Sequence, residues 1–137
     1  RVRRQPAQHR TRRDAVTSPR TVGDALEAAT ERWLVAQGLR PLARQVRYRL
    51  GEIDLVMLHA EVLVFVEVRY RATASHGDGL DSITRAKQKK LVRAAQLFLQ
   101  GQPRYANAPC RFDVVSVSGA STEPHFDWLR DAFRVDG

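Results

Sequence analysis

The chain alternates between short apolar runs and longer stretches whose apolar residues recur at helical spacing. Two apolar runs lie within residues 51–71 and are separated only by a polar break at 59–61, which predicts a β-hairpin. Residues 45–49 alternate in polarity like a strand at the edge of a sheet. Residues 111–118 are rich in valine and predict one further strand. The pattern therefore indicates a sheet with the hairpin near its centre.

Two amphipathic helices are expected to pack on this sheet. Apolar residues recur every three or four positions across residues 23–37, and Gly38 supplies the stop. The second helix is expected to begin after Thr84, which is a suitable N-cap, and to end at Gly101. Because this helix lies between two predicted strands, it implies a crossover and parallel pairing of those strands.

The predicted fold class is α/β, with elements in the order α-β-β-β-α-β and a central mixed sheet flanked by helices. The final segment, residues 126–133, fits either a short strand or one helical turn, and the sequence does not decide between them. A chain of 137 residues with 43% hydrophobic content can bury one core. We therefore expect a basic arm at residues 1–20 and a single domain at residues 21–137.

The net charge of +8 is distributed unevenly along the chain. Residues 1–20 hold seven arginines and one acid and so carry +6, which leaves +2 for residues 21–137. An arginine-rich arm without apolar periodicity is expected to be disordered and to add salt-sensitive attraction to phosphates. A solubilising terminus without a binding role explains the arm equally well.

Composition also narrows the possible locations. No apolar run approaches the roughly 18 residues that a membrane span needs. The single cysteine, Cys110, excludes an internal disulfide and a cysteine zinc cluster, and its neighbours predict a packed thiol beside Phe112. The histidines are scattered without metal-ligand spacing, and His76 is the one expected near the carboxylates described next. We therefore expect a cytoplasmic protein without membrane contacts.

Carboxylates interrupt both apolar runs of the predicted hairpin. Because side chains alternate between the faces of a strand, Glu52 and Asp54 share one face of the first run. Glu67 and Arg69 share a face of the second run in the same way. An isolated carboxylate is expensive to bury, and oxygen ligands converging from two paired strands suit a hard cation such as Mg²⁺. Glu52 fits either a place near this cation or a salt bridge at the rim.

The spacing of Asp54, Glu67 and Arg69 resembles the core of the PD-(D/E)XK nuclease fold, in which an aspartate and an acid-x-lysine triplet lie on adjacent strands. A longer part of the chain resembles the YraN-type family of uncharacterised bacterial proteins, which are relatives by fold of the archaeal Holliday-junction resolvases. This resemblance implies the restriction-endonuclease-like architecture. The matching positions are Gly23, Glu27, residues 51–56, residues 65–71, Thr84, Lys87, Leu91, residues 110–114 and residues 131–133.

The resemblance implies a Mg²⁺- or Mn²⁺-dependent nuclease that hydrolyses phosphodiester bonds in DNA, with branched or structured nucleic acid as its first candidate substrate. Asp54 and Glu67 would hold the metal, and Glu27 stands where such nucleases place a helical acid beside it. Arg69 replaces the usual lysine of the motif. Arginine stays protonated and cannot act as a base, but it can clamp phosphate oxygens. The implied catalytic set is therefore Glu27, Asp54, Glu67 and Arg69.

A second group of residues is expected to contact nucleic acid. Lys87 and Gln88 continue the buried stripe of the second helix toward one of its ends. Lys87, Arg71 and Lys90 would neutralise a phosphate backbone that the carboxylates repel, with Gln88 beside them. An ordinary solvated helix face is the alternative for the basic residues. A homodimer is a corollary of the resolvase likeness, because such enzymes cut two strands.

Two classes of function stay open at this point. A non-catalytic nucleic-acid-binding or partner-docking domain with the same fold explains the basic arm and Arg69 as well as a nuclease does. An enzyme acting on another substrate has no support, because the sequence contains neither a glycine-rich phosphate loop nor a Ser/His/Asp arrangement. Divalent-ion binding at the carboxylates distinguishes the two classes, since fold alone does not establish function.

Overall fold

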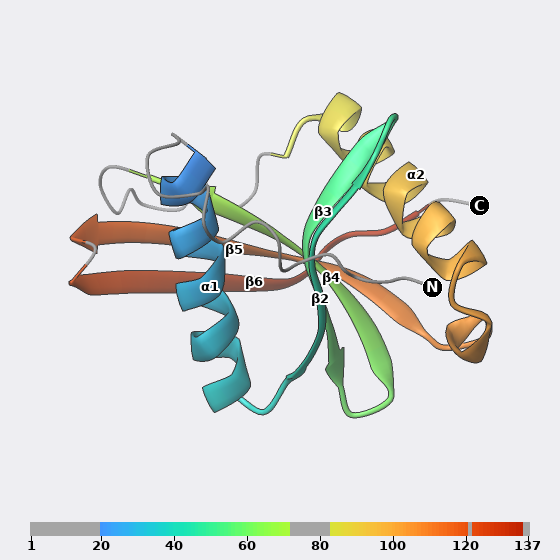
Figure 1. Ribbon diagram of the computed structural model, residues 1–137, viewed down its shortest axis with the longest axis horizontal. Helices are drawn as coiled ribbons and strands as arrows, with labels where there is room; N and C mark the ends of the chain where they lie inside the picture. The colour runs from blue at the N-terminus through green and yellow to red at the C-terminus, as the bar shows by residue number, and fades with distance from the viewer. Residues whose placement is uncertain (1–19, 72–82, 121, 136–137) are drawn as a thin grey trace.

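The computed structural model describes residues 20–71, 83–120 and 122–135 (Figure 1). The expected arm at residues 1–20, apart from Arg20, and His76, which was expected near the carboxylates, lie outside the described residues. The elements are α1 (Arg20–Ala36), β2 (Arg40–Tyr48), β3 (Gly51–His59), β4 (Val62–Tyr70), α2 (Arg85–Gln100), the 3-10 turn η2 (Pro103–Tyr105), β5 (Cys110–Ala120) and β6 (Glu123–Phe133).

The strands form one five-stranded sheet in the order β2-β3-β4-β5-β6. The β4–β5 pair is parallel, as the helix between the two strands predicts, and the other pairs are antiparallel. The expected α/β class is thereby confirmed, with one additional strand. That strand is β6, which settles the choice at residues 126–133 in favour of a strand and begins at Glu123.

Each helix covers one face of the strongly twisted sheet, and Figure 1 shows α1 and α2 on opposite sides of the strands. Helix α2 packs its buried side chains, among them Leu91 and Phe98, against Phe65 of β4. On the other face, Leu34 of α1 joins the second buried cluster. Trp33 of α1 stacks there on Phe126 of β6, with ring centroids 5.0 Å apart. Both helices therefore turn an apolar side toward the sheet, as the sequence predicts.

The central hairpin opens like a fork. The described pairing of β3 with β4 runs from His59 opposite Val62 to Leu55 opposite Val66. The same register continued by one residue would place Asp54 opposite Glu67. Two like charges directly opposite each other destabilise a ladder, so the point at which the described pairing ends agrees with the charge pattern of the sequence. Where the hairpin opens, Asp54 interacts with Glu27 of α1, and Glu67 interacts with Lys87 of α2.

Gly51 at the start of β3 lies directly against α2. A Cβ added at this position would stand 2.4 Å from the backbone carbonyl oxygen of Lys90, which is closer than real Cβ contacts. Only a residue without a side chain allows this approach. The contact explains the glycine that opens the first run of the hairpin, and it ties the open end of β3 to the helix that carries Lys87.

Two expectations need correction. The edge strand begins at Arg40 rather than at Gln45, because an edge strand tolerates Pro41 and absorbs it in a register shift before Ala43. Cys110 is exposed rather than packed beside Phe112, because it is the outermost residue of β5. Its Sγ lies 3.4 Å from the carbonyl oxygen of Ala108, and burial of part of the side chain raises the pKa of the thiol.

Candidate metal centre

Asp54 lies at the centre of the site, where β3 leaves β4. Its Oδ2 accepts a hydrogen bond from the backbone N–H of Val68 at 2.8 Å, which ties the carboxylate to β4 beyond the last described strand pair. Burial raises the pKa of Asp54, and the Val68 N–H opposes that rise because it favours the charged form. The side chain is therefore half-buried and anchored on one oxygen.

Glu67 enters the site from β4, with only 12% of its side chain exposed. The Nζ atom of Lys87 lies 3.4 Å from its Oε2. Burial, and then the charge of Asp54, raise the pKa of Glu67 to about 7, while Lys87 acts in the opposite direction. The backbone of Lys87 is fixed by the cap of α2, because the Oγ1 of Thr84 accepts a hydrogen bond from the Lys87 backbone N–H at 3.1 Å.

Glu27 reaches the site from α1. Burial raises the pKa of Glu27 to about 8, with the charge of Asp54 as the second cause. Its Oε1 is buried and has no hydrogen-bond partner in the structure. A buried acceptor without a donor costs about 1 to 3 kcal/mol. The structure thus brings together the three acids Glu27, Asp54 and Glu67 from three different elements.

The motif arginine also belongs to this neighbourhood. Arg69 lies on the same face of β4 as Glu67, and its positive charge lowers the pKa of Glu67. Arg71 follows the end of β4, and its backbone N–H donates to the carbonyl oxygen of Val117 at 2.8 Å. Arg69 is therefore placed beside Glu67, and the backbone of Arg71 is placed next to β5.

The remaining residues expected to contact nucleic acid lie on α2. The Nε2 of Gln88 donates to the carbonyl oxygen of Ile83 at 3.0 Å, so this side chain closes the first turn of the helix. Lys90 is exposed, and its backbone packs against Gly51. Gln88 thus has a structural contact beside the site, whereas the Lys90 side chain faces solvent.

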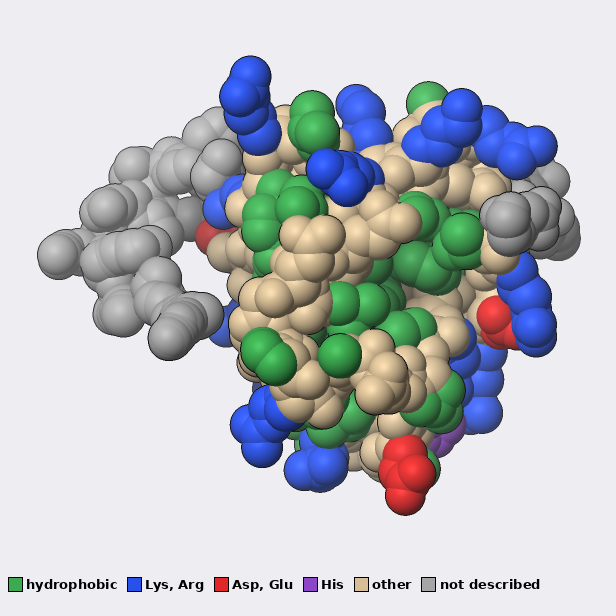
Figure 2. Space-filling model, turned by 90° about the vertical axis from the view of Figure 1, so that its right-hand side faces the viewer, with side chains coloured by type: hydrophobic (Ala, Val, Ile, Leu, Met, Phe, Trp, Pro, Cys, Tyr) green, Lys and Arg blue, Asp and Glu red, His purple; other side chains and the backbone are tan. Residues whose placement is uncertain are grey.

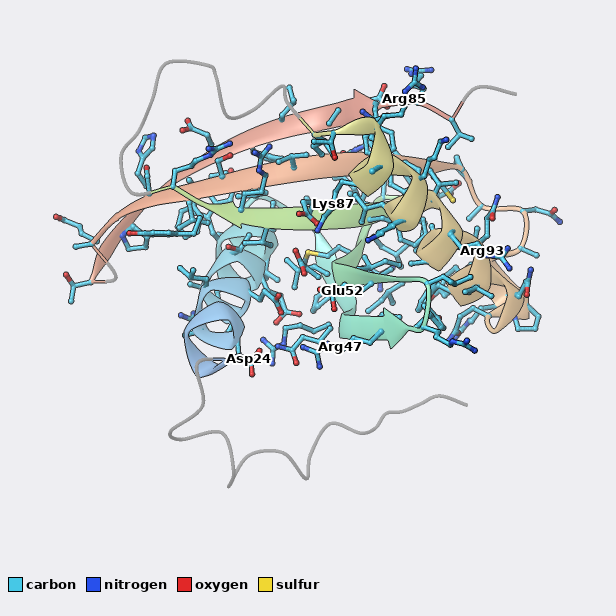
Figure 3. All side chains as sticks on the ribbon, turned by 90° about the horizontal axis from the view of Figure 1, so that it is seen from above. Asp24, Arg47, Glu52, Arg85, Lys87 and Arg93 are labelled. Atoms are coloured by element: carbon cyan, nitrogen blue, oxygen red, sulfur yellow. The ribbon has the colours of Figure 1, made fainter. Side chains whose placement is uncertain are left out.

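Glu52 forms a salt bridge at the rim of the site, which is one of the two roles that the sequence allows for it. Its Oε1 lies 3.3 Å from the Nε of Arg47, and both side chains are about half exposed. Figure 3 shows Arg47, Glu52, Lys87 and Asp24 in the space between α1 and α2. An exposed pair of this kind contributes little stability, so its importance lies in the charge that it places beside Asp54.

Two residues at the site were missed by sequence reasoning, Asp24 of α1 and Gln45 of β2. The Nε2 of Gln45 donates a hydrogen bond to Oδ1 of Asp24, and the Gln45 amide also acts to lower the pKa of Glu27. Gln45 has a positive φ of 57° inside a strand, which is a strained conformation for a residue with a side chain. Asp24 could have been found from its spacing, because it lies one helical turn before Glu27. No sequence signal marks Gln45.

The donor set fits a hard divalent cation. All three acids offer oxygen, Glu27 and Glu67 each respond to the charge of Asp54, and one buried oxygen lacks a donor. In the described residues no three acidic, histidine or cysteine side chains already stand close enough to hold a metal. Instead, the electrostatic interactions run from Glu27 through Asp54 to Glu67, where the Lys87 ammonium supplies the positive charge. An ion would have to draw these oxygens together.

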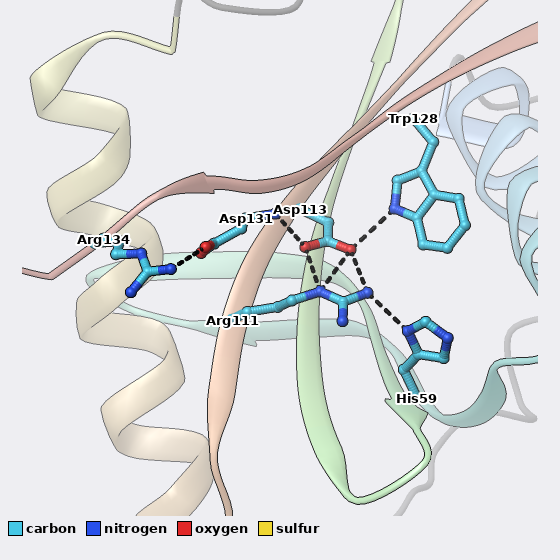
Figure 4. A network of polar contacts seen from close by, with 6 residues as sticks. All are labelled: His59, Arg111, Asp113, Trp128, Asp131 and Arg134. Atoms are coloured by element: carbon cyan, nitrogen blue, oxygen red, sulfur yellow. Dashed lines mark hydrogen bonds and ion pairs between the residues drawn. The ribbon is translucent and has the colours of Figure 1, made fainter.

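A second carboxylate network is structural. Asp113 is 1% exposed and accepts hydrogen bonds from Nε of Arg111 at 2.9 Å, Nε1 of Trp128 at 2.9 Å and the backbone N–H of Asp131 at 2.9 Å (Figure 4). The Arg111 guanidinium also contacts Nδ1 of His59 at 3.0 Å. Asp113 and Arg111 therefore form a structural ion pair. The network fastens β6 and the hairpin end to β5, and it leaves Asp113 no free oxygen to offer a ligand.

These observations define the class of protein. It is an α/β protein whose five-stranded mixed sheet is consistent with a restriction-endonuclease-like core, and its acids lie where the central hairpin opens. In the described part of the chain, no helix is long and apolar enough to cross a bilayer.

Residues 26–117 match the model of the uncharacterised protein family UPF0102. A UPF0102 protein of Xylella fastidiosa strain M12 is 53% identical over 117 residues, which cover 85% of this chain and 95% of the relative. A UPF0102 protein of Pseudomonas putida strain GB-1 is 51% identical over the same shares of both chains. A third, from Xanthomonas campestris strain B100, is 53% identical over 83% of this chain and 92% of the relative. The chain belongs to the UPF0102 family.

Proposed function

We propose that the chain is a metal-dependent nuclease that binds Mg²⁺ or Mn²⁺ between α1, β3 and β4 and hydrolyses phosphodiester bonds in DNA. The observation that carries the proposal is the convergence of Glu27, Asp54 and Glu67 on one half-buried place, with the pKa of each raised. Such an arrangement costs stability in the absence of a cation, and perturbed carboxyls of this kind cluster at functional sites.

The residues of the site divide into two roles in this proposal. Asp54 and Glu67, assisted by Glu27, would hold the ion, which when bound polarises the phosphate and lowers the pKa of a water molecule. Arg69 and Lys87 would bind the negative phosphate oxygens beside the acids. Lys87 is free to turn from Glu67 to a phosphate, because 44% of its side chain is exposed. Arg69 holds phosphate but does not take up a proton.

The charge on the surface beside the site supports a polyanionic substrate. Helix α2 contains no acidic residue, and its basic side chains Arg85, Lys89, Lys90 and Arg93 are exposed. Figure 2 views the α2 side of the molecule and shows Lys and Arg side chains along both margins of an apolar centre, with few acids. A phosphate backbone crossing this face would meet positive charge on its way to the carboxylates.

The test combines ion binding with cleavage. Calorimetry with Mn²⁺ alone is expected to show binding that Asp54→Ala and Glu67→Ala remove. With Mg²⁺ or Mn²⁺ present, the protein is expected to cut a member of a panel of branched, flapped, single-stranded and duplex DNA, and the same two variants are expected to bind that DNA without cutting it. Glu61→Ala, at the opposite end of the hairpin, is the matched control and should behave as the wild type.

Arg69 provides a finer test of the assigned roles. Arg69→Lys should retain cleavage if the side chain only stabilises phosphate charge. Arg69→Ala should lose about 2 to 4 kcal/mol of transition-state stabilisation, the usual scale for one electrostatic group.

A protein that binds no divalent ion and cuts no DNA or RNA of the panel, yet still binds nucleic acid, would instead be a non-catalytic binding domain. A dimer, measured by sedimentation, is a further expectation of the nuclease proposal.

A further inference from the structure

Gln45 occupies an unusual position in β2. Its neighbours pair regularly with β3, Arg44 opposite Leu55 and Val46 opposite Ile53, which places Gln45 across from Asp54. Its own φ of 57° lies in the left-handed region, which glycine and asparagine tolerate better than glutamine. Strain of this kind costs on the order of 1 to 3 kcal/mol and persists only where the surroundings maintain it. Gln45 therefore has a contact that compensates the strain.

That contact is with the carboxylates of α1. The Gln45 Nε2 carries two hydrogens and donates to Oδ1 of Asp24, and the Gln45 amide also interacts favourably with the charged carboxyl of Glu27, because it lowers the pKa of that group. Asp24 and Glu27 are one helical turn apart, so without a donor between them their charges repel each other. A glutamine amide is long enough to lie between both acids, and it brings no charge that would compete with a cation.

We propose that Gln45 is a positioning residue, which holds the Glu27 carboxyl from one side so that Glu27 faces Asp54 and keeps its unpartnered oxygen available to a divalent cation. Asp24 is the second anchor of the same amide. This inference rests on the proposed metal-dependent function for its consequence, but the contact itself belongs to the metal-free protein. Partners of this kind typically change metal affinity about 10- to 100-fold when they are removed.

The first test measures Mn²⁺ affinity by calorimetry on the full chain. Gln45→Ala is expected to weaken binding about 10-fold or more. Gln45→Asn retains the amide and suits the left-handed backbone better, but it is one methylene shorter, so it should also bind Mn²⁺ more weakly while melting no lower than the wild type. Gln96→Ala, at an exposed glutamine of α2, is the matched control. Wild-type Mn²⁺ affinity in Gln45→Ala or Gln45→Asn would overturn the positioning role.

The second test needs no metal and separates this inference from the proposed function. Thermal unfolding is compared in EDTA for the wild type, Gln45→Ala, Glu27→Gln and the double variant. If Gln45 acts through Glu27, the loss in Tm caused by Gln45→Ala is expected to shrink in the Glu27→Gln background, because the carboxyl on which the Gln45 amide acts is no longer there. Equal losses in both backgrounds would refute the contact. A wild type that binds no Mn²⁺ would refute the metal centre, and the unfolding cycle would still decide the role of Gln45.

Discussion

Acidification is expected to stabilise the metal-free protein, and Glu27 is the residue on which this effect depends most. The pKa of Glu27 is about 8 in the folded chain, against an ordinary value of 4.5. Between these values the folded protein keeps a proton that the unfolded chain releases. The stability that this bound proton contributes is therefore fully present below the pKa of Glu27 in the unfolded chain. It is lost as the pH rises through the pKa of Glu27 in the folded protein.

The magnitude follows from the same pKa. Each pH unit in this window changes the free energy of unfolding by at most about 1.4 kcal/mol for one carboxyl, which gives about 4 kcal/mol from pH 5 to pH 8. Water screens this half-buried group, and the other acids share the proton, so about 2 kcal/mol is the expected change. Glu67, whose pKa is about 7, adds to the same trend.

Urea unfolding followed by fluorescence of Trp33 and Trp128, in EDTA and at several pH values from 5 to 8, measures this change directly. Glu27→Gln should be more stable than the wild type at pH 8 and about equal to it at pH 5, because the amide has no proton to release. Glu31→Gln, one helical turn further along α1, is the control and should keep the wild-type pH profile. If Glu27→Gln and the wild type lose stability in parallel as the pH rises, the burial and charge argument for this site is wrong.

Further changes test the parts of the fold that place the site. Asp113→Ala should lose about 3 to 5 kcal/mol of stability, measured by urea unfolding, because the Arg111 guanidinium would stay largely buried without its partner. Gly51→Ala should lower the Tm by forcing β3 away from α2, at a cost of about 1 to 3 kcal/mol. Lys87→Met should raise the pKa of Glu67 further and cost about 1 kcal/mol at pH 8, and it should weaken DNA binding with a smaller salt dependence.

The sequence predicted those features whose causes are local. The hairpin, the two helices and the parallel β4–β5 pair follow from apolar periodicity, capping residues and the connection between them. The full length of β6 could not be predicted, because an edge strand is covered unevenly and its apolar residues keep no clear period. The exposure of Cys110 depends on where β5 begins, which is the least certain property of any predicted element.

The same distinction between local and long-range causes applies to the residues of the candidate site. Asp54 and Glu67 are visible in the sequence because they interrupt apolar strands, but Gln45 is not, because its left-handed backbone depends on acceptors that α1 supplies from 21 residues earlier. Only the folded chain brings these groups together.

The fork in the hairpin connects the fold to the proposed chemistry. An antiparallel ladder that continued one residue past Leu55 and Val66 would set Asp54 and Glu67 against each other. A chain selected only for stability would place apolar or oppositely charged residues there, since two half-buried acids, a third from α1 and a strained Gln45 all reduce the stability of the metal-free fold. A divalent cation would reverse the sign of these interactions at once, because it favours the charged form of every carboxyl that it contacts. The position of the fork is therefore the one that the proposed binding of a cation would require.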